Sequence, residues 1–98
     1  MTILTDTNNN AYVEITPVKV KITDTTDATR LYVNIQNDNL YSQAIFLYRL
    51  TDEQGVGTSG VKERGTIVMG ATAYTDWTGD NETPFDYIST QFGITINS

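Results

Sequence analysis

The stretch "YSQAIFLYRLT", residues 41–51, decides the fold class because apolar residues run along both sides of it. Successive side chains of a β-strand point to opposite faces of the sheet. The pattern gives two apolar faces, with Ala44, Phe46, Tyr48 and Leu50 on one and Ile45 and Leu47 on the other. A strand that is apolar on both faces is central in its sheet or covered by another layer. We therefore expect this strand in the middle of a sheet or against a partner.

Two segments before this stretch show the same two-residue period. In "RLYVNIQN", residues 30–37, the pattern sets Leu31, Val33 and Ile35 against Tyr32, Asn34 and Gln36. In "YVEITPVKVKIT", residues 12–23, it sets Val18, Val20 and Ile22 against Lys19, Lys21 and Thr23. Pro17 cannot donate to a β-ladder, so it predicts a sheet edge or a break. The turn residues of "DTTDAT", 24–29, and "NDN", 37–39, would connect these strands.

The segments after the central stretch continue the β pattern. The run "DEQGVGTSGVKERG", residues 52–65, predicts a hairpin with a long or bulged connection, with glycines at Gly55, Gly57, Gly60 and Gly65. The run "TIVMGATAYTDW", residues 66–77, predicts a strand pair or one strand broken at Gly70. Short β-runs with regular turn signals are typical of a sandwich or a small barrel. We predict an all-β protein, an antiparallel β-sandwich that is Ig-like or related.

One short helix is expected near residues 84–92. Thr83 can cap its N-terminus, Pro84 suits the first helical position, and Asp86 stands where a capping box reaches back. An apolar face is predicted from the spacing of Phe85, Ile88 and Phe92, and Gly93 is a suitable terminator. A helix this short needs packing to be stable. Because "GITIN", residues 93–97, resumes a β pattern with Ile94 and Ile96, we expect the helix to cross one end of the core.

The chain of 98 residues has no break in composition, which predicts a single domain over residues 11–98. Residues 1–10 are polar except for Ile3 and Leu4 in the first half, and they predict a flexible arm or one that docks on a neighbour. No basic, apolar leader and no stretch of membrane-spanning length is present. We therefore expect no signal peptide.

The net charge and the residue types that the sequence lacks narrow the possible classes of partner and of chemistry. The net charge of −6 makes nucleic acid and anionic membranes poor partners. The sequence contains no cysteine and no histidine, so it lacks thiolate chemistry and the usual general base. We predict that the protein is not an enzyme and uses no cofactor.

The most polar loop is "DWTGDNE", residues 76–82, which offers Asp76, Asp80, Asn81 and Glu82 beside Asp86. Calcium needs several oxygen ligands, but the twelve-residue EF-hand pattern is absent. The pattern favours a structural turn with a helix N-terminus over a metal site, and it leaves open whether the loop binds a cation. The glycine-rich run at 55–60 lacks the Lys-Ser/Thr of a phosphate-binding loop.

The aromatic residues allow two interpretations. We expect Trp77 in the core, packed under the short helix against Phe85 or Ile88. Tyrosines are enriched at protein interfaces, so Tyr12, Tyr32, Tyr41 and Tyr48 are interface candidates together with Ile3 and Leu4. A structural corner is predicted from Tyr74, Trp77, Phe85, Ile88, Phe92 and Gly93.

The segment "GATAYTDWTGDNETPFDYISTQFGITI", residues 70–96, resembles the C-terminal pattern of small virion-associated proteins of tailed bacteriophages. The resemblance rests on Tyr74, Trp77, Asp80, Asn81, Ile88, Phe92, Gly93 and Ile94. It implies a non-enzymatic structural protein of a phage particle, made in the host bacterial cytoplasm. The expected partners are other virion proteins, bound in multiple copies. A capsid cement or accessory protein is the first interpretation, and a neck or tail component is the next.

Two further function classes stay open at the level of sequence. Surface tyrosines on a β-sandwich would also suit a module that binds carbohydrate or a cell surface. A small acidic chain could instead be an inhibitor of another protein. The sequence does not distinguish the site in a particle, the copy number or the order of the strands.

Overall fold

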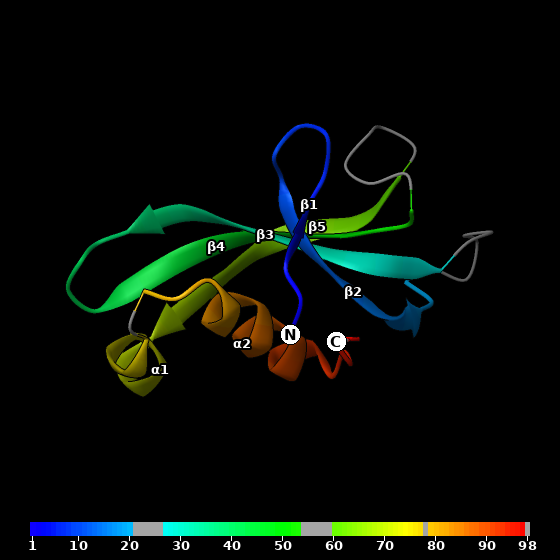
Figure 1. Ribbon diagram of the computed structural model, residues 1–98. Helices are drawn as coiled ribbons and strands as arrows, with labels where there is room; N and C mark the ends of the chain where they lie inside the picture. Colours follow the sequence, from blue (N-terminus) through cyan, green and yellow to red (C-terminus); the bar gives the residue numbers. More distant parts are fainter. Residues whose placement is uncertain (21–26, 54–59, 78, 98) are drawn as a thin grey trace.

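The computed structural model describes residues 1–20, 27–53, 60–77 and 79–97. Five antiparallel strands form one sheet in the order β1-β2-β3-β4-β5 (Figure 1). The strands are β1 (Leu4–Thr5), β2 (Ala11–Val18), β3 (Ala28–Asp38), β4 (Gln43–Thr51) and β5 (Val61–Gly70). Each strand lies beside the next one along the chain, so the sheet is an antiparallel meander. The prediction of a mainly β, antiparallel fold is confirmed.

Strand β4 lies inside the sheet, as its two apolar faces predicted. It pairs with β3 along one side, where Leu31 lies opposite Leu50, and with β5 along the other, where Phe46 lies opposite Ile67. Ala44, Phe46 and Leu50 are buried in the core, and Tyr48 packs against its margin. The four residues expected to share one face of this strand therefore all lie on the side of the core.

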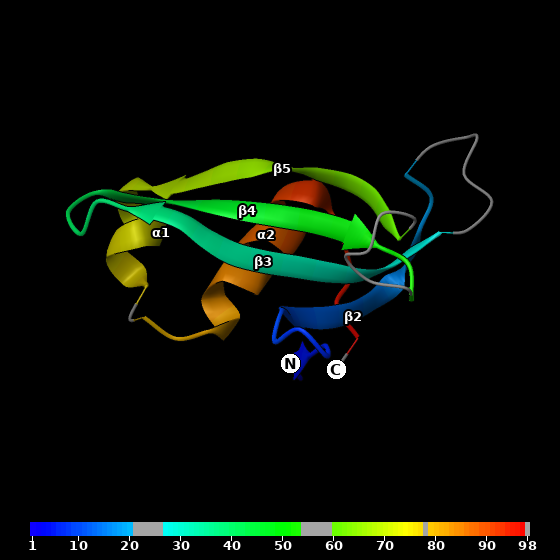
Figure 2. The same cartoon turned by 90° about the horizontal axis from the view of Figure 1, so that it is seen from above.

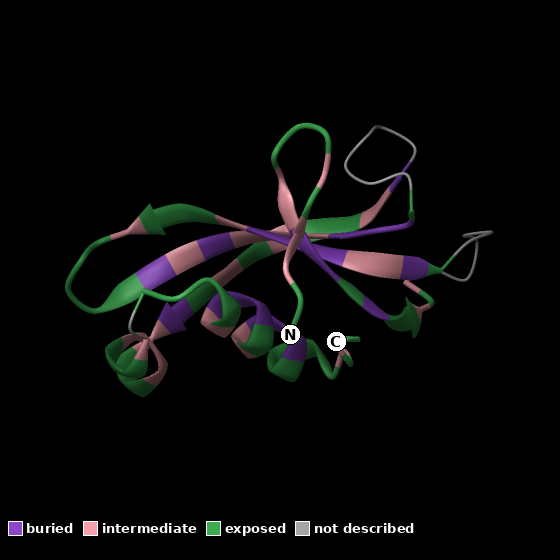
Figure 3. Ribbon diagram, viewed as in Figure 1, coloured by how far each residue is buried: buried purple, intermediate pink, exposed green. Residues whose placement is uncertain are grey.

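The other layer of this sandwich-like arrangement is supplied by helix α2 (Glu82–Phe92). Figures 1 and 2 show α2 lying across one face of the sheet. Phe85 and Ile88 point from α2 into the core, which they share with Val13, Leu31 and Phe46. Figure 3 shows the buried positions along the strands and on α2, with exposed positions at the β3–β4 hairpin tip. The hydrophobic core thus lies between one sheet face and one helix.

The start of α2 differs from its prediction. The helix begins at Glu82, so Thr83 and Pro84 lie within its first turn rather than at the cap and the first position. The capping acceptor is Asp80, whose Oδ2 accepts from the backbone N–H of Glu82 at 3.2 Å and of Thr83 at 2.9 Å. Asp86 is not part of a capping box. A carboxylate can accept these N–H groups as well as a hydroxyl can, so the pattern allowed both starts.

A glycine stands at the end of α2 and another at the end of β5. Gly93 caps α2 with φ of 68°, in the left-handed region that glycine enters without strain, as predicted. A second helix, α1 (Ala71–Asp76), follows β5 directly. Strand β5 ends at Gly70, where a break was predicted, but both predicted alternatives continued as β-structure and the structure has a helix instead. A six-residue helix carries too few turns to leave a clear periodic signal.

The C-terminal segment returns to the sheet as an isolated bridge rather than a full strand. Ile96 pairs antiparallel with Ile15, and the backbone N–H of Thr16 donates to the Thr95 carbonyl at 2.9 Å. The backbone N–H of Asn97 donates to the carbonyl of Glu14 at 2.8 Å. These bonds hold the end of the chain beside β2.

The first residues lie on the protein's own sheet. Strand β1 pairs with β2, with Leu4 opposite Tyr12, and Ile3 packs against the core. Asp6 closes the turn, because its Oδ1 accepts from the backbone N–H of Asn8 and of Asn10, each at 2.9 Å. In the isolated chain, these contacts and the hairpin turn hold the predicted arm, residues 1–10, against the protein's own sheet.

Some predicted turns and strands differ in their bounds. Strand β2 ends at Val18 and its register shifts between Glu14 and Val18, around Pro17, as the proline predicted. The β3–β4 turn comes after Asp38, slightly later than the predicted 37–39. The predicted positions of Lys21, Ile22 and Thr23, residues 24–26 of the predicted 24–29 turn, and the hairpin glycines Gly55 and Gly57 lie outside the described residues.

Candidate binding surfaces

The tip of the β3–β4 hairpin displays two large hydrophobic side chains to solvent. Leu40 is 84% exposed and Tyr41 is 88% exposed. Burying such side chains against a partner would remove apolar surface from water, which is favourable. We name Leu40 and Tyr41 the hairpin knob.

Side-chain hydrogen bonds hold the knob in one conformation. Asn39 Oδ1 accepts from the backbone N–H groups of Tyr41, Ser42 and Gln43 at 2.9, 2.9 and 3.0 Å. Asp38 Oδ1 accepts from the backbone N–H of Leu40 at 2.8 Å. These bonds satisfy the backbone of the turn, so the knob is built as an Asx-type turn.

The knob includes backbone strain and a link to α1. Leu40 has φ of 59°, which an L-residue with a side chain adopts at a cost of about 1–2 kcal/mol. The hydroxyl of Tyr74 donates to Asp38 Oδ1 at 2.7 Å, so α1 supports the same carboxylate that holds Leu40. This hydrogen bond to Asp38 raises the pKa of Tyr74. Strain at an exposed apolar residue points to a functional role for its position.

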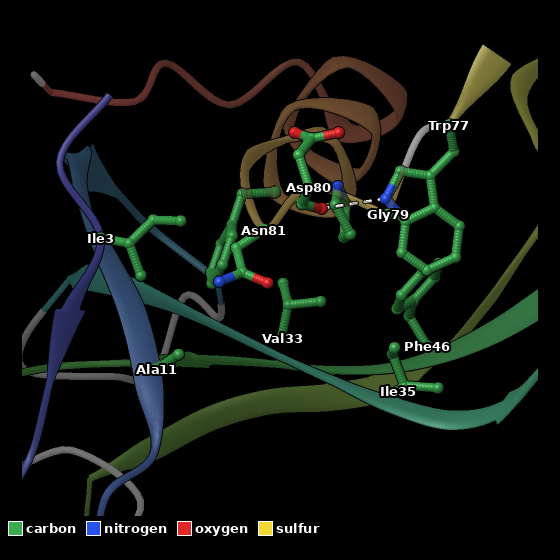
Figure 4. Close-up of a pocket in the computed structure, with 11 residues that line it drawn as sticks. Ile3, Ala11, Val33, Ile35, Phe46, Trp77, Gly79, Asp80 and Asn81 are labelled. Atoms are coloured by element: carbon green, nitrogen blue, oxygen red, sulfur yellow. Dashed lines mark hydrogen bonds between the residues drawn. The ribbon is translucent and has the colours of Figure 1, made fainter.

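A pocket lies between the sheet and the loop that precedes α2 (Figure 4). Its volume is about 220 Å³. Most of its lining is apolar and comes from Ile3, Val33, Ile35, Phe46, Trp77 and Phe85. Because these residues come from the N-terminus, β3, β4 and the α1–α2 region, no short sequence motif could have predicted the pocket.

Hydrogen bonds fix the loop that forms the pocket rim. The indole N–H of Trp77 donates to the carbonyl oxygen of Asp80 at 2.9 Å (Figure 4). The Asp80 carboxylate accepts from the Thr83 hydroxyl at 2.7 Å and from the backbone N–H groups of Glu82 and Thr83 at the start of α2. The bonds from Thr83 hold the pKa of Asp80 below its usual value. Within the described residues, no group of three or more acidic side chains could hold a metal ion, and the loop is built as a helix cap.

The sheet face opposite α2 carries all three arginines of the chain. Tyr32, Arg49 and Arg64 lie opposite one another across β3, β4 and β5, and Arg30 lies two residues from Tyr32. The Arg30 guanidinium lies 4.5 Å from the ring centroid of Tyr12, and that of Arg49 lies 5.8 Å from the ring of Tyr32. The three arginines are far apart in sequence, so only the strand register shows them as one group.

The predicted tyrosine candidates occupy different surroundings. Tyr12 and Tyr32 are buried with their ring centroids 5.0 Å apart, and burial raises the pKa of Tyr32. Tyr48 packs against Phe92 at a centroid distance of 4.9 Å. Tyr41 is therefore the one of these four whose ring is largely open to solvent.

Of the predicted corner residues, Tyr74 and Trp77 lie beside each other, whereas the Phe92 ring packs against Tyr48 on β4. The Trp77 ring lies edge-on to Phe46 at 5.5 Å and to Tyr74 at 6.2 Å. The expected partner was Phe85 or Ile88, and the closest ring partner in the structure is instead Phe46 on β4. Trp77 thus fastens the end of α1 to the sheet.

Comparisons with protein-family models, curated proteins and solved structures found no match to this chain. Among the described residues, no helix is both long enough and apolar enough to cross a membrane.

Proposed function

We propose that the protein is a non-enzymatic structural component of a phage particle that binds neighbouring virion subunits. A capsid cement or accessory protein is the first form of this proposal, and a neck or tail component is the second. The sequence resemblance over residues 70–96 supports the phage context. The hairpin knob supports the mode of action, which is the occupation of a neighbouring surface.

The single observation that carries the proposal is the exposure of Leu40 and Tyr41 on a turn whose backbone is hydrogen-bonded to Asp38 and Asn39. A free loop would lose conformational entropy on binding, which weakens association. The bonds from Asn39 and Asp38 fix the turn before any partner arrives, so this cost is largely absent. Tyrosine is also a frequent hot-spot residue at interfaces.

The size of the knob predicts a weak individual contact. Full burial of a side chain such as Leu contributes about 1.5–3 kcal/mol, and an aromatic ring buries about 150–250 Å². Two such side chains cannot alone offset the loss of translational and rotational freedom, which is several kcal/mol. Tight attachment would then depend on repeated sites on a large particle, where linked contacts give avidity.

Co-sedimentation tests the proposal. The probe is virions of the phage that encodes the chain, assembled without it. The wild-type protein is expected to sediment with these particles at a fixed stoichiometry. The double variant Leu40→Ser/Tyr41→Ser is expected to stay in the supernatant. Val68→Thr, which changes an exposed apolar side chain on β5, is the matched control and should bind as the wild type does. A wild-type protein that stays free of the particles would refute the proposal.

The carbohydrate-binding alternative needs an exposed aromatic platform. Among the four tyrosine candidates only Tyr41 is largely exposed, and the Trp77 ring packs edge-on against Phe46. No described feature therefore favours this alternative over protein binding. A glycan array probed with the wild-type protein tests it directly.

A further inference from the structure

One stretch of β3 has a free edge. Strand β2 pairs with β3 only as far as Tyr12 opposite Tyr32, while β4 continues along β3 to Asp38. Within the described part of the chain, residues 33–38 therefore pair on the β4 side alone, with a register shift at Gln36 between Ile35 and Asn37. A free strand edge presents backbone N–H and C=O groups that can pair with another chain. Adding a strand to such an edge is a common mode of peptide recognition.

The pocket opens beside this edge. It is lined by Ala11 at the start of β2 and by Val33 and Ile35 of β3, so it lies where β2 leaves β3 (Figure 4). Ile35 pairs with the fully buried Phe46, yet Ile35 itself is 56% exposed. The core layer is thus incomplete over this end of β3, and an apolar side chain there stays in contact with water.

The volume of the pocket indicates the size of its occupant. Small-molecule and cofactor sites usually enclose about 300–1,000 Å³. This pocket encloses about 220 Å³, which is below that range. Its dimensions suit a single large side chain. A side chain delivered by a strand on the β3 edge would complete the layer that Ile35 leaves open.

Charge indicates the chemistry of the partner. Residues 65–98 contain Asp76, Asp80, Glu82 and Asp86 but neither lysine nor arginine. Asp80 lines the pocket and Asp38 ends the free edge. A second copy of this chain, paired edge to edge about a two-fold axis, would place these acidic groups against one another. A basic strand would instead meet opposite charge, which favours association and fixes its register.

We propose that residues 33–38 bind an extended, basic segment of another protein as an added antiparallel or parallel strand. One large apolar side chain of that segment enters the pocket over Ile35 and beside Trp77, and lysines or arginines flank it near Asp38 and Asp80. This inference rests on the proposed function, because it specifies the second surface by which the protein holds a neighbouring subunit.

Synthetic peptides test the inference without knowledge of the natural partner. The panel consists of end-blocked octapeptides in which lysine alternates with threonine around a central Leu, Ile, Phe or Tyr. Each is titrated into ¹⁵N-labelled full-length protein, and amide chemical shifts are followed by NMR. At least one peptide is expected to bind with a dissociation constant below about 1 mM, the weak end of specific recognition. Shifts should centre on residues 33–38 and on the Trp77 indole.

Three controls sharpen the result. Peptides with glutamate in place of lysine should cause no shifts at these residues. Ile35→Lys, at an exposed position, should weaken binding at least about tenfold because it adds a positive charge and removes an apolar contact. Asp80→Asn should weaken binding more than Asp86→Asn, although both variants change the net charge equally. Circular dichroism confirms that each variant is folded.

The outcomes separate this inference from the proposed function. The strand-addition inference is overturned if no lysine peptide changes the amide chemical shifts of residues 33–38. It is also overturned if the shift changes centre on the sheet face that carries Arg30, Arg49 and Arg64. Binding to virions through the hairpin knob would still stand in that case. If the peptides bind as expected while the protein does not sediment with virions, the inference holds and the proposed phage function falls.

Discussion

Replacing Ile88 with alanine tests whether α2 is held by packing against the sheet. The Ile88 side chain is 0% exposed and lies with Phe85 against core residues from β2, β3 and β4. Truncating a buried isoleucine to alanine loses its transfer free energy and leaves a cavity, together about 2–5 kcal/mol. A loss near 3 kcal/mol is a large part of the total stability of a small domain, which is about 5–15 kcal/mol.

The loss of stability converts into a measurable temperature shift. In a domain of this size each kcal/mol lowers Tm by about 4–8 °C, so Ile88→Ala should lower Tm by about 12–24 °C. The assay is thermal unfolding followed by far-UV circular dichroism and checked by calorimetry. Ile88→Val should cost only about 0.5–1.5 kcal/mol, and Gln91→Ala, at an exposed position of the same helix, should stay within about 0.5 kcal/mol of the wild type. A loss below about 1 kcal/mol for Ile88→Ala would refute the packing of α2 that we describe.

Three further variants test local features by unfolding measurements. A Cβ at Gly65 would lie 2.8 Å from the hydroxyl oxygen of Tyr48, so Gly65→Ala should lower the stability by about 1 kcal/mol through overpacking. In the background of Tyr48→Ala, which removes that hydroxyl, the same change should be neutral or stabilising. Gly93→Ala should destabilise the protein by about 1–2 kcal/mol because the φ of 68° at this position is left-handed. If the variant were as stable as the wild type, the left-handed cap at the end of α2 would be contradicted. The pKa of Asp80 is lowered in the folded state. The contribution of this carboxylate to the stability of the fold is therefore present above the ordinary pKa of about 4, and it is lost as pH falls through the lower folded value. Asp80→Asn should therefore show a shallower loss of Tm between neutral and strongly acidic pH.

Much of the fold follows from the sequence, because the signals concerned are local. The two-residue period over residues 41–51 predicted the strand that the structure has at Gln43–Thr51 and the residues on each of its faces, since alternation directly reports which side chains share a sheet face. The apolar spacing of Phe85 and Ile88 and the glycine at 93 predicted α2 and its end. The exact start of α2 was not predicted, because Asp80 and Thr83 can both cap a helix and only the folded loop selects between them.

The candidate surfaces depend on contacts that the sequence does not display. The strand register brings Arg30, Arg49 and Arg64 together on one side of the sheet. The pocket beside the β3 edge exists because β2 leaves β3 after Tyr32 while the loop before α2 closes over the gap.

The sequence by itself determined the types of the long strands and of α2, the central strand, the acidic character and the lack of thiol and imidazole chemistry. These properties follow from composition and from the period of neighbouring residues. Only the tertiary structure decided that Tyr12 and Tyr32 are buried, that Tyr41 is exposed, and that the edge of β3 is free. Exposure and pairing depend on which distant segments meet, and that is set by the packing of the whole chain rather than by any one stretch of it.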